Sequence, residues 1–121
     1  MSSYIPITDR AFGFAVRIIK LCNFLDQQPG TPRLLANQLF RSGTSIGANL
    51  EESQSAQSVK DFISKQQIAL KEAKETRYWL RLLIETEMIE AEKITKLLDE
   101  CEQLMKILAK SIVTSKQKLK H

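Results

Sequence analysis

Apolar residues recur every three or four positions along most of the chain, which is the spacing of amphipathic helices. Interruptions in this pattern divide it into four segments, and we predict helices over residues 9–27, 32–54, 59–86 and 90–114. No window shows the two-residue alternation typical of a strand. Because the connections are short, the pattern predicts an all-α fold, an up-down-up-down four-helix bundle.

Local signals indicate where the helices begin. Thr8 and Asp9 are the candidate caps of the first helix, which a Pro-Gly pair ends. Thr31 is the candidate cap of the second helix, because proline follows it and suits a first helical turn. Ser58 and Asp61 have the spacing of a capping box before the third helix.

The first helical segment is apolar on two sides. One stripe consists of Phe12, Ala15, Val16, Ile19 and Cys22. The other consists of Phe14, Ile18, Leu21 and Leu25. A helix that is apolar around so much of its circumference is expected to be buried on more than one side.

The second segment has small and polar residues where an ordinary helical hairpin has leucine. These residues are Ser42, Ser45, Gly47 and Asn49. A glycine inside a helix costs about 1 kcal/mol relative to alanine, and close approach of a neighbouring helix is the usual compensation. We therefore expect this motif to pack the second helix closely against the third, with hydrogen bonds. A kink or break near Gly43 is the alternative.

One face of the third segment carries Ile68, Trp79 and Leu82, which would lie beside solvent in a monomer. Exposed apolar patches usually mark subunit contacts, and tryptophan is enriched at their centres. These three residues are our candidate oligomer interface. The alternative is that a thicker bundle core absorbs Trp79.

Another face of the third segment mixes cations with an aromatic ring. It consists of Lys71, Lys74, Tyr78 and Arg81. Such a surface can neutralise phosphates and stack a base, so these residues are our candidate nucleic-acid site. The alternative, which this chain alone favours, is a solvated face with ion pairs such as Lys71–Glu75.

The net charge of +4 belongs to the end of the chain, because Gln103–His121 contains five lysines and no acidic residue. The rest of the chain is nearly neutral. A lysine-rich terminus is more often a frayed, solvated helix end than a binding arm. We expect fraying after Val113.

Candidate catalytic chemistry is absent from the sequence pattern. The single histidine is His121, outside every predicted helix, so the Glu-x-x-His ligands of di-metal bundles are missing. Cys22 and Cys101 fall in apolar stripes and are expected to be buried, reduced thiols, as in cytosolic proteins. No glycine loop that could hold a phosphate occurs. We therefore predict no enzyme activity, no cofactor, no metal and no catalytic residues.

The chain length of 121 residues suits one domain, and we predict a single bundle over residues 1–121. The apolar run near the N-terminus contains Arg17 and Lys20 and lacks the features of an export signal. No window provides the roughly 20 nearly uncharged apolar residues of a membrane span. The expected location is the cytoplasm, with no membrane partner.

Two stretches resemble a known family. Residues 42–53 read SGTSIGANLEES, and residues 62–80 read FISKQQIALKEAKETRYWL. Both resemble the signature of small bacterial four-helix bundle proteins related to the 23S rRNA intervening-sequence proteins, in the expected order. Ser53 stands where the family often has glycine or alanine.

The resemblance implies a homopentameric ring with no enzymatic activity. Some family members are encoded within insertions in large-subunit rRNA genes. A relative, the accessory variability protein of diversity-generating retroelements, is a basic pentamer that binds nucleic acid and a reverse transcriptase. The implied partners are therefore other copies of the chain, RNA or DNA, and a protein partner. The alternative function is a protein–protein interaction scaffold that does not bind nucleic acid.

Overall fold

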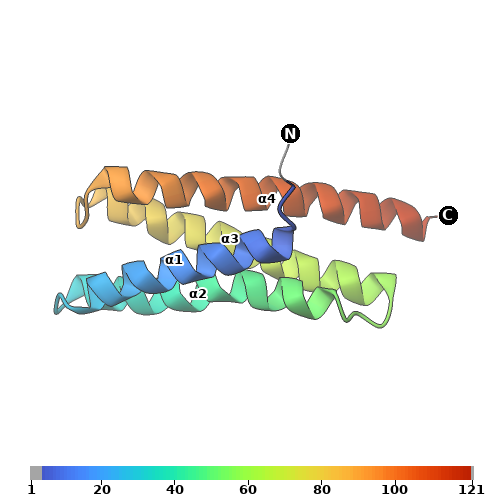
Figure 1. The fold of residues 1–121 in the computed structure, drawn as a ribbon, viewed down its shortest axis with the longest axis horizontal. Helices are drawn as coiled ribbons and strands as arrows, with labels where there is room; N and C mark the ends of the chain where they lie inside the picture. Colours follow the sequence, from blue (N-terminus) through green and yellow to red (C-terminus); the bar gives the residue numbers. More distant parts are fainter. Residues whose placement is uncertain (1–3, 121) are drawn as a thin grey trace.

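The structure, a computed structural model, describes residues 4–120. It contains four helices, α1 (Ile7–Asp26), α2 (Thr31–Ser53), α3 (Val59–Glu85) and α4 (Ala91–Leu119). Successive helices run in opposite directions along one long axis (Figure 1). The predicted all-α, up-down-up-down four-helix bundle is confirmed, and residues 4–120 contain no strand.

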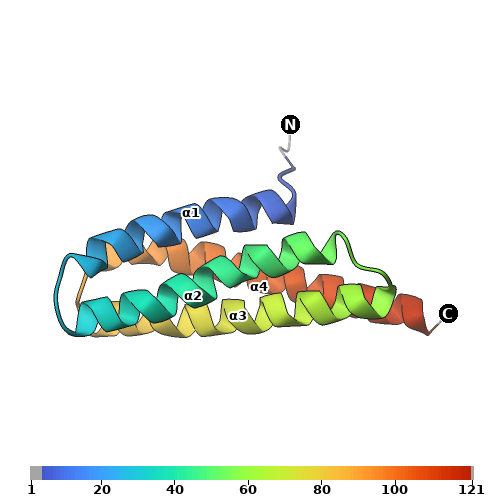
Figure 2. The same cartoon turned by 90° about the horizontal axis from the view of Figure 1, so that it is seen from below.

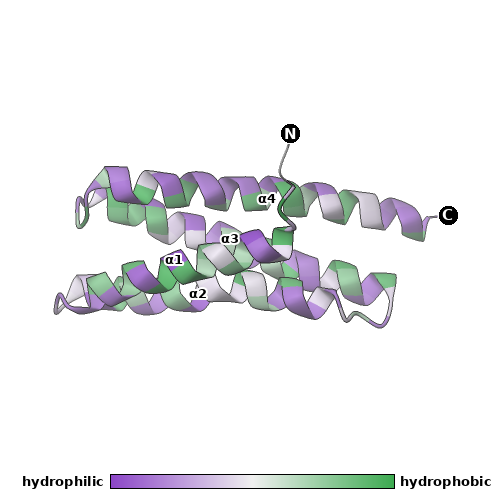
Figure 3. Cartoon of the chain, viewed as in Figure 1, coloured by the Kyte–Doolittle hydropathy of each residue, from purple (hydrophilic) through white to green (hydrophobic). Residues whose placement is uncertain are grey.

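All four helices contribute to one apolar core. Its largest fully buried side chains include Phe14, Ile18, Leu25, Leu39, Ile46, Leu50, Leu80, Leu83, Ile94, Leu104 and Leu108. Each such side chain contributes about 1.5–3 kcal/mol when removed from water. Apolar and polar residues alternate around each helix, as the periodicity of the sequence predicts (Figure 3).

The helices differ in length, and this difference shapes one end of the bundle. α1 has 20 residues, whereas α4 has 29. The last turns of α4 consequently project beyond α1 (Figure 2). The expectation that the chain frays after Val113 is wrong, because α4 remains helical to Leu119. Lysines in its last turn complement the negative end of the helix dipole.

Two predicted helix caps are wrong. α1 begins after Pro6, whose carbonyl accepts a hydrogen bond from Arg10 N at 3.0 Å, so Thr8 and Asp9 lie inside the first turn. Gly30, with a φ of 93°, takes the cap position of α2 and places Thr31 in the helix. That positive φ favours glycine, which lacks a Cβ atom.

The predicted cap of α3 is confirmed. Ser58 Oγ accepts a hydrogen bond from Asp61 N at 3.0 Å. The Asp61 carboxylate accepts from Gln57 N at 3.3 Å, one residue earlier than in a standard capping box.

The glycines of α2 allow close packing against α1. The helix continues unbroken through Gly43, so a break there is excluded. A Cβ atom on Gly43 would lie 2.8 Å from Ile18 Cγ2, closer than side-chain atoms can approach. A Cβ on Gly47 would lie 3.5 Å from Ala11 O. The expectation that Gly47 packs α2 against α3 is therefore wrong, because its open side faces α1.

Candidate functional site

Of the predicted packing motif Ser42, Ser45, Gly47 and Asn49, Ser42 is the residue whose side chain hydrogen-bonds to α3. Ser42 and Thr76 are fully buried, and their hydroxyl oxygens share a hydrogen bond of 2.9 Å. Thr76 Oγ1 also lies 2.8 Å from the carbonyl of Glu72. The two hydroxyls thus satisfy each other inside the α2–α3 contact. Sequence reasoning did not include Thr76 in this contact.

Ser45 and Asn49 hydrogen-bond within their own helix. Ser45 Oγ donates to Arg41 O at 2.6 Å, and Asn49 Nδ2 donates to Ser45 O at 2.8 Å. Short polar side chains inside helices commonly bond the preceding turn in this way. The expectation that these two side chains hydrogen-bond across to α3 is therefore wrong.

Arg41 of α2 forms ion pairs with two acidic residues of α3, Glu72 and Glu75. Its guanidinium pairs with Glu72 at 3.2 Å and also pairs with Glu75. Glu75 is therefore occupied across the helix contact, and the Lys71–Glu75 pair expected for a solvated face does not form. Within residues 4–120, neither Lys71 nor Lys74 has a carboxylate partner.

The four residues of the candidate nucleic-acid site are all exposed on α3: Lys71, Lys74, Tyr78 and Arg81. Tyr78 is 54% exposed, and its ring meets the Trp79 ring edge-on with centroids 5.2 Å apart. Glu72 and Glu75 of this helix pair with Arg41 of α2, whereas these cations face solvent. This segregation of charge leaves a surface that can attract an anion.

A groove of about 290 Å³ joins the basic side of α3 to α4. It is lined by Leu70, Lys74, Arg77, Glu102, Met105, Lys106 and Ala109. Arg77 and Glu102 form a long ion pair of 3.9 Å across it. Lys106, which the sequence assigns to a separate lysine-rich end, therefore lies in the same groove as Lys74. Only the pairing of α3 with α4 brings them together.

The candidate oligomer interface, Ile68, Trp79 and Leu82, is less exposed than the sequence predicts. Trp79 is half-buried and packs against the core rather than lying beside solvent. Its indole Nε1 is buried without a hydrogen-bond acceptor among the described residues. Ile68 is 39% exposed and Leu82 is half-buried, so these two residues supply the accessible apolar surface of this face.

Further exposed apolar side chains lie on α1 and α2. Phe12 is 68% exposed, and Val16 and Ile19 are each 37% exposed on the same side of α1. Phe40 of α2 is 48% exposed. The sequence expects two buried sides for α1, and the stripe containing Phe14 is buried within one chain. In the other stripe Cys22 is buried, whereas Phe12, Val16 and Ile19 stay exposed.

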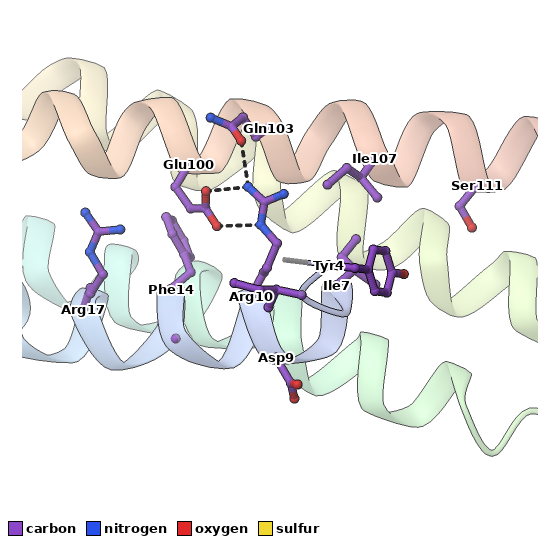
Figure 4. Close-up of a pocket in the computed structure, with 12 residues that line it drawn as sticks. Tyr4, Ile7, Asp9, Arg10, Phe14, Arg17, Glu100, Gln103, Ile107 and Ser111 are labelled. Atoms are coloured by element: carbon purple, nitrogen blue, oxygen red, sulfur yellow. Dashed lines mark hydrogen bonds and ion pairs between the residues drawn. The ribbon is translucent and has the colours of Figure 1, made fainter. Parts of the chain in front are cut away.

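A second groove, of about 880 Å³, runs between α1 and α4 (Figure 4). Arg10 crosses it and pairs with Glu100 at 3.0 and 2.6 Å, and donates to Gln103 at 2.8 Å. The hydrogen bond to Glu100 raises the pKa of Arg10. This arrangement ties α1 to α4, and Arg10 and Glu100 neutralise each other.

The two cysteines are structural. Both are free and buried, and their Sγ atoms donate to Ala36 O at 3.4 Å and Ala73 O at 3.2 Å. Burial raises the pKa of Cys22 to about 11 and that of Cys101 to about 12. Because the thiolate is the nucleophile, neither thiol is activated near neutral pH.

Two further features of residues 4–120 concern ligands and membranes. These residues bring together no group of three or more His, Cys, Asp or Glu side chains that could hold a metal ion. None of their helices combines the length and apolarity that a membrane span requires.

Comparison with known proteins places this geometry in a family. Residues 5–110 match the 23S rRNA-intervening sequence protein family. The chain also resembles a crystal structure of a protein of unknown function from the S23 ribosomal protein family of Bacteroides thetaiotaomicron. The two share 45% sequence identity with a TM-score of 0.82, over 88% of this chain and 98% of the other. Among curated proteins, none matches.

Proposed function

Because the chain belongs to the 23S rRNA-intervening sequence protein family, we propose that it is a non-enzymatic accessory protein that forms a homopentameric ring and binds RNA or DNA. One observation carries the nucleic-acid part of this proposal. Arg41 pairs with Glu72 and Glu75 of α3, and Lys71 and Lys74 have no carboxylate partner among residues 4–120.

The proposed contacts are those of a surface that recognises a phosphate backbone. Lys71, Lys74 and Arg81 contact phosphates, and each contact releases condensed counterions. Tyr78 presents an exposed ring on which a base can stack without sequence preference. A net charge of +4 gives one chain only weak attraction. A ring presents the surface several times, and this multivalency raises the overall affinity.

Self-association is supported by the apolar surface that one chain leaves uncovered. Phe12, Val16 and Ile19 lie on one side of α1 and are exposed. Ile68 and Leu82 add a second accessible patch on α3. Contiguous exposed apolar patches are typical of subunit contacts. The number of subunits in the proposal comes from the family resemblance.

The proposal is tested by measuring retention of structured RNA and of DNA over a range of salt concentrations. Wild-type protein should bind at low salt, and its affinity should fall by about one log unit per log unit of salt for each phosphate contact. Reversing Lys71, Lys74 and Arg81 to glutamate should abolish binding. The matched control reverses Lys20, Lys93 and Lys96, which are also exposed.

Each outcome has a defined meaning. Binding that survives the first triple reversal would move the interface to another surface. Equal loss in both triple variants would indicate dependence on net charge alone. If wild-type protein retains neither RNA nor DNA at low salt, the nucleic-acid proposal is wrong. The second candidate, a protein-interaction scaffold, then stands, and the exposed aromatic residues Phe12 and Phe40 favour it.

A further inference from the structure

The α3–α4 groove concentrates positive charge in a small concave space. Lys74 and Arg77 approach it from α3, and Lys106 approaches it from α4. Glu102 is the acidic residue among the lining side chains, and it is engaged with Arg77 at 3.9 Å. Three cations facing one carboxylate leave the groove with an excess of positive charge, which favours an anion.

Apolar side chains also line this groove. They are Leu70, Met105 and Ala109. The groove volume of about 290 Å³ is too small for a folded partner but suits a single phosphate with part of its sugar. Cationic and apolar side chains together can contact the phosphate and the sugar of one nucleotide.

Tyr78 does not line this groove itself, but it follows the lining residue Lys74 by one turn of α3. Positions four apart on a helix share one face, so Tyr78 stands one turn, about 6 Å, beyond Lys74. Its ring is 54% exposed, and the edge contact with Trp79 restrains it. A phosphate in the groove would therefore place an adjoining base within reach of an oriented aromatic ring.

Lysines continue from the groove along α4. Lys106 and Lys110 are one helical turn apart, and both are exposed. Because α4 remains helical to Leu119, the later lysines stand on an ordered helix rather than on a frayed end. The structure thereby connects two basic segments that are about 30 residues apart in the sequence.

We infer that the α3–α4 groove is a nucleotide position, in which Lys74, Arg77 and Lys106 hold one backbone phosphate while Tyr78 stacks the neighbouring base. This inference rests on the proposed nucleic-acid function and deepens it. It assigns the contact to two helices rather than to α3 alone. It also predicts that a strand leaving the groove follows α4 past Lys110.

The fluorescence of Trp79 can report binding in the α3–α4 groove. It is the single tryptophan of the chain, and its ring touches Tyr78. Titration with oligouridylate or oligothymidylate at low salt should change Trp79 fluorescence in a saturable manner. Inorganic tripolyphosphate should compete but should change the fluorescence less, because it has no base to stack.

The decisive variant is Lys106→Glu, with Lys96→Glu as its control on the same helix and with the same change in charge. Lys106→Glu should weaken oligonucleotide binding about tenfold and lower the log–log salt slope by about one. Lys96→Glu should remain within about twofold of wild type. Tyr78→Leu should weaken binding about tenfold, whereas Tyr78→Phe should retain it. Thermal unfolding by circular dichroism checks that each variant is folded.

The results separate this inference from the function on which it rests. If wild-type protein binds and Lys106→Glu behaves like Lys96→Glu, the groove is not the site, although the proposed function stands. Binding that leaves Trp79 fluorescence unchanged overturns the inference in the same way. If wild-type protein binds no oligonucleotide, both the inference and the proposed function are wrong.

Discussion

The hydroxyls of Ser42 and Thr76 lie 2.9 Å apart at a position where α2 and α3 exclude solvent from both side chains. A buried polar pair of this kind specifies how two helices are aligned, because sliding either helix would separate the hydroxyls and leave that of Ser42 without its partner on α3. The surrounding core is apolar and would tolerate such sliding more easily.

We predict that Thr76→Val lowers the free energy of unfolding by about 1–3 kcal/mol, because Ser42 then keeps a buried hydroxyl without its partner. The double variant Ser42→Ala with Thr76→Val should be more stable than the sum of the two single effects predicts. Urea denaturation of the four proteins measures this coupling. Strictly additive losses would show that the hydroxyl pair contributes no mutual stabilisation.

Replacing each of the two glycines of α2 by alanine should change the stability of the protein differently. Gly47→Ala should be neutral or stabilise by up to about 1 kcal/mol, because its new Cβ would lie in ordinary contact with Ala11. Gly43→Ala should destabilise by about 1–3 kcal/mol, because its Cβ would collide with the stiff, buried Ile18. Thermal or urea unfolding compares the pair. Equal effects would mean that α1 can move away from Gly43.

A larger side chain at Gly47 should not be tolerated. We expect Gly47→Leu to destabilise by about 1–3 kcal/mol, since the extra atoms would press on the backbone of α1 at Ala11. The denaturation midpoint measures the effect, with Gly47→Ala as the matched control. A midpoint equal to that of wild type would show that this contact is loosely packed.

Assembly should depend on the uncovered apolar surfaces. Sedimentation equilibrium at micromolar concentration should show an oligomer for wild type and dissociation for Phe12→Asp or Leu82→Arg, because burying a charge at a subunit contact is costly. Val113→Asp is the control, since Val113 is an exposed apolar residue on α4. Normal assembly of both variants would move the interface elsewhere, and a monomeric wild type would refute self-association.

Stability should fall as the pH rises above 9, partly because of the two buried thiols. Folding raises the pKa of Cys22 to about 11 and of Cys101 to about 12, from a reference of 9.0. Above pH 9 the unfolded chain releases thiol protons that the folded chain retains. Each thiol therefore lowers the free energy of unfolding by up to about 1.4 kcal/mol per pH unit, until the pH reaches its pKa in the folded chain. The variant with alanine at both positions should lose less stability between pH 9 and 11. An identical pH dependence would contradict the assignment.

Local features of the sequence were sufficient to predict the helices. Helical periodicity, the Ser58 cap and the breaks between segments depend on neighbouring residues, so they can be recognised without a fold. The errors at the ends of α1, α2 and α4 have local causes as well. Pro6 and Gly30 took cap positions that the hydroxyl residues after them were expected to fill.

The sequence by itself determined that this chain forms four amphipathic helices with a glycine-containing, polar second helix, because periodicity and backbone preference are properties of short segments. Only the tertiary structure decided which neighbour each side chain meets. Gly47 faces α1, Glu75 pairs with Arg41 instead of Lys71, and Lys106 lines the same groove as Lys74. The physical reason is that such contacts depend on how helices distant in sequence rotate and align when they bury a common core. That alignment is a collective result of packing, which no single segment encodes.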